Sequence, residues 1–118
     1  ARRGGAGRAR ELARELWSRY GCAAVVKGGH GEGDAAVDVL CEGGEISEFS
    51  APRVAEPVST HGTGCSFAAA LAAELATGRC LADAVAGAKR YVLAAIRRAY
   101  FAGNNCGVLG FVEPADLI

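Results

Sequence analysis

Residues 60–76 read THGTGCSFAAALAAELA, a glycine-rich turn that runs directly into an alanine-rich segment. Alanine and leucine favour helix, so this composition predicts a helix from about Gly64 to Thr77 that stops at Gly78. A turn that opens a helix leaves backbone N–H groups unpaired, and the positive end of the helix dipole favours an anion. The stretch therefore predicts a helix whose first turn can cradle a phosphate.

Upstream of this turn, the sequence predicts a helix, a buried strand and a β-hairpin. Apolar residues follow one helical stripe from about Ala9 to Tyr20. The uninterrupted apolar run Cys22–Val26 is typical of a strand that is buried on both faces. Two β-prone runs, Ala35–Cys41 and Glu45–Ser50, flank a two-glycine turn and predict the hairpin.

Downstream, the apolar periodicity predicts a last helix from about Leu81 to Phe101, followed by a loop or short tail from Gly107 to Ile118. The order helix, strand, hairpin, helix, helix indicates an α/β fold. A buried strand needs a neighbour on each side, so we infer that part of the sheet lies outside this chain. We expect a single domain over residues 1–118, with poor order in residues 1–7 and 104–118.

The composition is that of a globular protein and excludes several classes of function. Hydrophobic residues make up 51% of the 118 residues, and the 13 basic and 13 acidic side chains cancel, so nothing favours nucleic acid. No apolar run is long enough for a membrane span. The five cysteines lack metal-ligand or disulfide-framework spacing, which favours a reducing cytoplasm and no metal site. We expect Cys22, Cys41 and Cys80 to be core thiols.

The turn before the second helix supplies the candidate catalytic residues Gly62, Thr63, Gly64 and Cys65. The glycines let the backbone approach a phosphate closely, and a thiol at a helix start can accept the proton of an attacking hydroxyl. His61 is placed in sequence to tune that thiol or to shuttle a proton. The alternative is a tight turn that needs positive φ, with Cys65 as a small buried hydrophobe. The residues alone leave both interpretations open.

A second candidate lies where the buried strand ends, at Lys27, Gly28 and Gly29. Ligands gather at strand ends in open α/β sheets, so Lys27 is a candidate for nucleotide phosphate, and the glycines for close approach of the nucleotide. The alternative is a glycine-rich turn with a solvated lysine. The hairpin also carries several carboxylates, which we interpret as a solvated face that protects the sheet edge. They are Asp34, Asp38, Glu42, Glu45 and Glu48.

Four segments in this order resemble a known family. They are Val26–His30, Ala36–Leu40, Ala51–Val54 and Thr60–Cys65, with further similarity from Ala84 to Lys89 and at Tyr91. Together they resemble the C-terminal part of the hydroxymethylpyrimidine/phosphomethylpyrimidine kinases, which belong to the ribokinase-like superfamily. The tail after Gly103 is not covered by the resemblance.

The resemblance implies part of a ribokinase-like three-layer sandwich and a cytoplasmic phosphotransferase of thiamine biosynthesis that uses ATP and Mg²⁺. It implies that Gly62, Thr63 and Gly64 bind the transferred phosphate and that Cys65 faces the hydroxyl of a small pyrimidine substrate. It also places Lys27, Gly28 and Gly29 near the nucleotide.

Members of the family are considerably longer, and the part missing here carries most of the pyrimidine pocket. We therefore expect this chain to be the C-terminal part of a longer kinase domain and to be inactive alone. Three alternatives stay open: a pyridoxal-kinase-like enzyme, a hydroxyethylthiazole-kinase-like enzyme, and a non-catalytic nucleotide-binding fragment. The unfinished sheet edge also leaves a homo-oligomer open.

Overall fold

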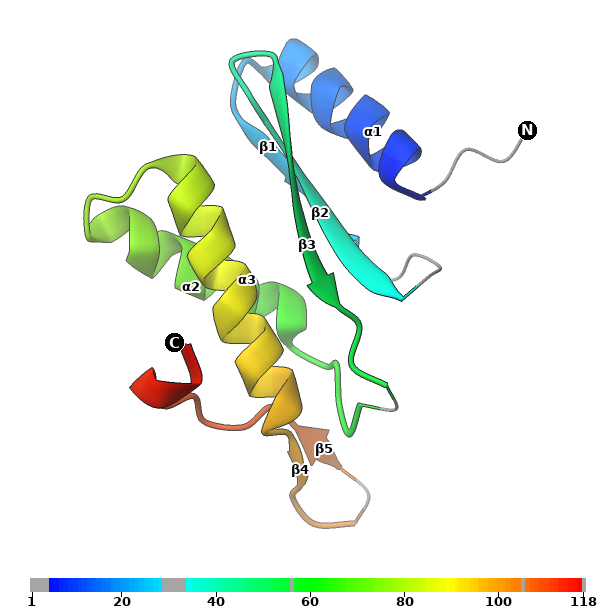
Figure 1. Cartoon of the computed structure of the whole chain (residues 1–118), viewed down its shortest axis with the longest axis vertical. Coiled ribbons are helices and arrows are strands. Elements are labelled where there is room, and N and C mark those ends of the chain that lie inside the picture. The colour runs from blue at the N-terminus through cyan, green and yellow to red at the C-terminus, as the bar shows by residue number, and fades with distance from the viewer. Residues whose placement is uncertain (1–4, 29–33, 56, 105, 118) are drawn as a thin grey trace. The chain divides into compact units, whose positions relative to one another are not determined.

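The chain forms two compact units, Ala1–Arg53 and Val54–Ile118. A computed structural model describes residues 5–28, 34–55, 57–104 and 106–117. Within these ranges lie three α-helices, five strands and one short 3-10 helix (Figure 1). None of these helices is both long and apolar enough to cross a lipid bilayer. Helices and strands occur in each unit, so the predicted α/β class is confirmed.

Helix α1 (Gly5–Tyr20) opens the first unit and ends where the sequence predicts. The N–H of Gly21 donates to the carbonyl of Trp17 at 2.9 Å, and Gly21 itself adopts a φ of 68°. Glycine tolerates this left-handed conformation, so it closes the helix without steric cost. The helix starts before the expected Ala9, because residues 5–8 carry no large apolar side chain that would reveal the first turn.

A three-stranded antiparallel sheet in the order β1-β2-β3 belongs to the same unit (Figure 1). The strands are β1 (Ala24–Val26), β2 (Ala35–Glu42) and β3 (Glu45–Pro52). Strands β2 and β3 form the predicted hairpin, and the turn residues Gly43 and Gly44 have φ values of 60° and 85°. Two successive left-handed residues suit a type I′ turn, whose twist matches that of the paired strands.

The core of the first unit lies between α1 and β2. Val39 and Cys41 are fully buried on one face of β2 and cluster with Ala13 of α1. The residues packed around this cluster are Ala9, Trp17, Val26 and Ile46. Because side chains alternate along a strand, Asp38 and Leu40 belong to the opposite face of β2, and each is 1% exposed. Burial on both faces is thus a property of β2, although the sequence predicts it for β1.

Strand β1 is only half-buried along its length, so that prediction is wrong for this chain. Within the described residues its strand partner is β2 alone, with Val25 opposite Leu40. A strand at the end of a sheet keeps one ladder edge unpaired. The inference that neighbouring strands lie outside the chain stays a prediction.

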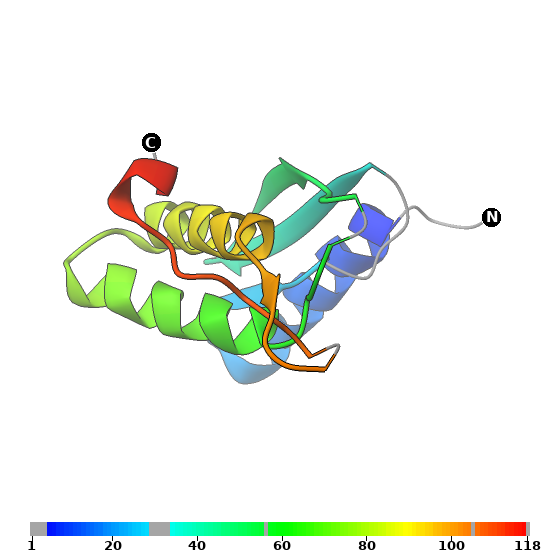
Figure 2. The same ribbon diagram turned by 90° about the horizontal axis from the view of Figure 1, so that it is seen from below.

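In the second unit, α2 (Thr63–Ala76) and α3 (Leu81–Arg97) pack side by side (Figures 1 and 2). Phe67 of α2 is buried, and α3 buries a row of mostly small side chains. That row is Ala84, Val85, Gly87, Ala88, Val92, Ala94 and Ala95. Gly87 permits close packing, because a Cβ there would lie 3.0 Å from the carboxyl carbon of Glu74. As predicted, Gly78 closes α2, with a φ of 89°.

The chain beyond α3 differs from the prediction. Helix α3 ends at Arg97, whereas the sequence predicts an end near Phe101. Strand β4 (Tyr100–Phe101) pairs antiparallel with β5 (Gly107–Val108), and a 3-10 helix, η1 (Pro114–Leu117), follows. A short hairpin and a helical turn therefore replace the expected loop.

The backbone bonds at the end of α3 explain this difference. The N–H of Ala99 donates to Ile96 at 3.1 Å, while the carbonyl of Ala95 accepts the N–H of Gly110. The returning tail thus takes the place of the next helical donor. Apolar periodicity continues past Arg97 and carries no signal for this replacement.

Candidate functional site

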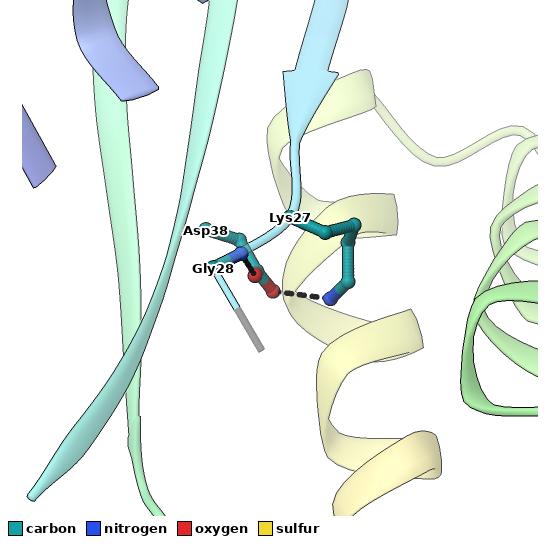
Figure 3. Close-up of polar contacts among 3 residues, drawn as sticks. All are labelled: Lys27, Gly28 and Asp38. Atoms are coloured by element: carbon teal, nitrogen blue, oxygen red, sulfur yellow. Dashed lines mark hydrogen bonds and ion pairs between the residues drawn. The ribbon is translucent and has the colours of Figure 1, made fainter. Parts of the chain in front are cut away.

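The strand-end candidate is built around a buried carboxylate (Figure 3). The ammonium nitrogen Nζ of Lys27 lies 2.5 Å from Oδ2 of Asp38. The backbone N–H of Gly28 donates to the other oxygen of the same carboxylate, Oδ1, at 2.9 Å. Lys27 and Gly28 follow β1, and Asp38 lies in β2, so one acidic side chain joins the end of β1 to the central strand. Gly29 lies outside the described residues.

This geometry corrects the sequence interpretation of Asp38. We expected a solvated carboxylate, but Asp38 is 1% exposed and ion-paired. A buried charge is costly unless it is paired and hydrogen-bonded, and Asp38 meets both conditions. The other carboxylates of the hairpin are exposed as predicted: Asp34, Glu42, Glu45 and Glu48. The sequence carries one sign of this burial. Asp38 lies two residues before Leu40, so the two side chains share one face of the strand, and the surrounding residues are apolar.

Gly28 has a structural reason to be glycine. A Cβ at this position would collide with the backbone carbonyl oxygen of Val37. The close approach that Gly28 permits is therefore the approach of one strand end to its neighbour. Its contact with a nucleotide stays a prediction.

The second candidate is the turn that opens α2. Gly62 is the N-cap residue, with φ of 86° and ψ of 3°, a conformation that favours glycine. The N–H of Thr63 donates to Thr60 at 3.3 Å, and the N–H of Ser66 donates to the carbonyl of Gly62 at 2.9 Å. The tight-turn interpretation is thus correct for Gly62.

The same turn keeps the features that an anion requires. No side chain caps the start of α2, and its first turn contains no acidic residue. The first helical hydrogen bond of α2 is donated by the N–H of Ser66. The N–H groups of Gly64 and Cys65 come before it, so they are among the donors at the start of a helix that have no partner within the helix. A Cβ at Gly64 would meet no atom within 4 Å, so the space beside this backbone is open. The turn offers donors, a helix dipole and room for a phosphate.

Cys65 and His61 are both exposed. Exposure excludes the interpretation of Cys65 as a buried hydrophobe and leaves its thiol accessible. The backbone N–H of His61 donates to Oγ of Ser59 at 3.1 Å, which fixes the backbone before the turn. A contact between the His61 ring and the Cys65 sulfur is not among the interactions found for the described residues, so the tuning role stays a prediction.

The other cysteines follow the expectation only in part. All five are unpaired, as the spacing predicts. Cys41 is a core thiol, but Cys22 and Cys80 are exposed, so that prediction is wrong for these two. Cys22 lies just after α1 and Cys80 just before α3, where the chain turns between elements. Local apolar context does not distinguish such positions from core positions.

The two candidates belong to different compact units. Lys27, Gly28 and Asp38 lie in the first unit, and the turn from Gly62 to Cys65 lies in the second. Among the described residues, no group of three histidine, cysteine or acidic side chains could hold a metal ion. The chemistry that the residues themselves offer is anion binding at the start of α2, a fixed ammonium at the end of β1, and an accessible thiol.

A family model, curated relatives and a solved structure each match most of this chain. The family described as phosphomethylpyrimidine kinase matches residues 5–110. The thiamine biosynthesis bifunctional protein ThiED of Geobacter sulfurreducens is 41% identical over 107 residues, which are 91% of this chain and 22% of that protein. The hydroxymethylpyrimidine/phosphomethylpyrimidine kinase of Streptomyces coelicolor is 45% identical over 84 residues, covering 71% of this chain and 30% of the kinase.

A solved structure gives the same fold. The ADP complex of Bacillus subtilis pyridoxal kinase matches with a TM-score of 0.77 and 32% identity, over 85% of this chain and 38% of that one. The predicted ribokinase-like α/β fold is confirmed by this likeness. The chain spans less than two fifths of each of these three proteins. With the family match extending over residues 5–110, the chain belongs to the phosphomethylpyrimidine kinase family.

Proposed function

We propose that this chain is the nucleotide and anion-binding part of a hydroxymethylpyrimidine/phosphomethylpyrimidine kinase that acts in thiamine biosynthesis. The observation that carries the proposal is the uncapped first turn of α2, in which Cys65 is exposed. This turn lies within the segment that the family model matches, residues 5–110. The full-length protein would transfer the γ-phosphoryl group of ATP to the hydroxymethyl group of the pyrimidine or to its phosphate ester. We propose that both compact units are parts of one longer kinase domain.

The start of α2 is proposed to hold the phosphoryl group during transfer. Charge spreads over the outer oxygens of this group in the transition state, and preorganised donors stabilise it. The N–H groups of Gly64 and Cys65 and the dipole of α2 supply this stabilisation. Gly62 sets the entry angle of the chain, and Thr63 begins the helix.

Cys65 is proposed to accept the proton of the attacking alcohol. The alcohol oxygen forms a bond to the γ-phosphorus, the bond from that phosphorus to the bridging oxygen breaks, and ADP leaves. The hydroxyl proton passes to Cys65, which acts as a thiolate and lies exposed in the first turn of α2. His61, four residues earlier, is proposed to tune the thiol or to carry the proton away.

Lys27 is proposed to bind the nucleotide phosphates as a point charge at the end of β1, next to Gly28 and Gly29.

The use of Mg²⁺ is inferred from the family resemblance alone. Within the described part of the chain, no cluster of histidine, cysteine or acidic side chains could hold a metal ion. Magnesium in such enzymes is held largely by substrate phosphates and water, and we propose that it enters with the nucleotide.

Three other candidate functions are compared with this one. The likeness to pyridoxal kinase, whose structure contains ADP, favours a pyridoxal-type alcohol as the second choice. The other two are phosphorylation of a hydroxyethylthiazole-type alcohol and nucleotide binding without catalysis.

We further propose that the substrate is a small molecule and that the protein is cytoplasmic, in line with its five unpaired cysteines. The free edge of β1 is proposed to pair with the rest of the sheet or with a second copy of the protein.

The test is ATP-dependent phosphorylation of the three alcohols side by side by the full-length protein. The proposal predicts the highest kcat/KM for hydroxymethylpyrimidine, because the sequence matches lie chiefly with its kinases. The 118-residue chain alone is predicted to be inactive in the same assay. A preference for pyridoxal would replace the proposal by its rival, and turnover of none of the three would support the non-catalytic alternative.

A further inference from the structure

The carboxylate of Asp38 contacts the two functional groups that follow β1, the Lys27 ammonium through Oδ2 and the Gly28 backbone N–H through Oδ1 (Figure 3). We propose that Asp38 is a positioning residue that holds the Lys27 ammonium in place for the nucleotide phosphates. The proposal rests on the proposed function, because it assigns Lys27 to the nucleotide.

The location of Asp38 makes it a rigid support. It lies in β2, the central strand of the sheet, and the register pairs Val26 with Val39, so the next residues along each strand are Lys27 and Asp38. Asp38 is 1% exposed and has little room to move, whereas the Lys27 side chain is 38% exposed. The buried partner therefore determines where the mobile partner lies.

Lysine needs such a support more than most charged residues. Its ammonium sits on a flexible four-carbon stem, and ordering that stem costs conformational entropy. Oδ2 of Asp38 accepts one N–H of this ammonium and so fixes its position. An ammonium that is already in place when phosphate charge develops needs no reorganisation at that moment.

A second interpretation of the ion pair predicts the opposite effect on ATP binding. If Asp38 only neutralised Lys27, removing its charge would raise the positive potential at the end of β1 and tighten ATP binding. If Asp38 positions Lys27, removing the charge lets the ammonium move, and catalysis falls without tighter binding. The separate values of kcat and of the KM for ATP therefore distinguish the two roles.

Asp38→Asn is the informative variant. The asparagine oxygen can still accept the Gly28 N–H, but the NH₂ group that replaces Oδ2 is only a donor and cannot accept from the Lys27 ammonium. Asp38→Glu is the second variant, which keeps the charge and displaces the carboxylate by one methylene. Lys27→Met removes the ammonium, and the double variant Lys27→Met/Asp38→Asn completes a cycle. Glu42→Gln is the matched control. Glu42 is an exposed carboxylate on β2, the strand that carries Asp38, and the alternation of side chains places both on the same face.

Steady-state kinetics of the full-length protein are expected to show kcat reduced roughly 10- to 100-fold by Asp38→Asn, because small misplacements of a catalytic group cost that much. The KM for ATP should rise, because the displaced ammonium no longer meets the phosphates, and Asp38→Glu should also lose activity. Asp38→Asn should cause no further loss in the Lys27→Met background. Additive losses in the cycle, or a lower KM for ATP with unchanged kcat, would overturn the proposal.

A binding measurement separates failure of this proposal from failure of the proposed function. Calorimetry of ADP and of adenosine with the same variants does not depend on turnover. Asp38→Asn should weaken ADP binding and leave adenosine binding unchanged, even if no alcohol is phosphorylated. Equal affinity of wild type and Asp38→Asn for ADP, in an otherwise active kinase, would count against Asp38 alone.

Discussion

The backbone N–H of Gly110 donates to the carbonyl of Ala95 at 3.1 Å and so ends the hydrogen-bond ladder of α3 with a donor from the returning tail. At the same point the tail lies against the helix end, where a Cβ on Gly110 would collide with the carbonyl oxygen of Arg98. This contact is the reason that α3 stops at Arg97, and it holds the tail on the second unit.

Gly110→Ala should destabilise the full-length protein by about 1–3 kcal/mol, the usual cost of forcing extra atoms into a packed position. Urea denaturation of wild type and variant measures this difference. Gly64→Ala is the matched control, because a Cβ there meets nothing within 4 Å. An unchanged midpoint for Gly110→Ala would show that the tail does not rest on α3 in solution.

Gly64→Ala itself should change stability and activity in opposite directions. Gly64 lies inside α2, where alanine is more favourable than glycine by roughly 0.5–1 kcal/mol, so stability should rise slightly. The new methyl group would occupy the open space proposed for the phosphoryl group. We expect kcat/KM to fall by at least about tenfold, because misplacing the phosphate weakens the donors that stabilise its transition-state charge.

Parallel unfolding and kinetic measurements on one preparation check this opposition. Ala68→Gly in the same helix is the control for propensity alone, since it lies beyond the first turn and is exposed. It should lower stability and leave the rate unchanged. Full activity of Gly64→Ala would mean that no phosphate approaches the backbone at this position.

Asp116 predicts a pH-dependent stability of the tail. The backbone N–H of Glu113 donates to Oδ2 of Asp116 at 2.8 Å, and Nε of Arg98 lies 2.7 Å from the same oxygen. The Glu113 N–H is the main cause that lowers the pKa of Asp116 below 3.8; the Arg98 guanidinium lowers it further, and desolvation opposes both. A carboxylate with a lowered pKa in the folded state stabilises that state above its unfolded pKa and loses this effect as pH falls.

Asp116→Asn should therefore weaken the tail near neutral pH, and the difference from wild type should disappear as the pH falls through the lowered folded-state pKa of Asp116. Amide hydrogen exchange in the segment from Gly107 to Leu117 is the readout. Asp34→Asn, an exposed aspartate in the other unit, is the control and should show no such trend. A difference that persists undiminished at acid pH would show that the charge of Asp116 does not hold the tail.

The elements with strong local signals were predictable from the sequence. The amphipathic stripe of α1, the two-glycine turn of the hairpin and the start of α2 after Gly62 all follow from periodicity and turn chemistry. The end of α3 did not, because the carbonyl of Ala95 is satisfied by Gly110, a residue distant in sequence. The burial of β2 rather than β1 also depends on which strand is central, and sequence order does not determine that.

The candidate site was predictable to a similar degree. The Gly62–Cys65 turn was found because its donors and its thiol are contiguous in sequence. Asp38 was missed because its partner, Lys27, directly follows another strand, and only the antiparallel register brings the two side chains together. Gly28 was assigned to a ligand, yet the strand packing against Val37 already requires a glycine there.

The most direct test of the central claim is the rate of ATP-dependent phosphorylation of hydroxymethylpyrimidine by the full-length protein and its Cys65→Ala variant. Cys80→Ala, at another exposed cysteine, is the control and should keep the wild-type rate. The account predicts an active wild type and a fall in kcat of about 100-fold or more for Cys65→Ala, the usual loss for a general base. Full turnover by Cys65→Ala, or a wild type that transfers no phosphate to the pyrimidine, would contradict it.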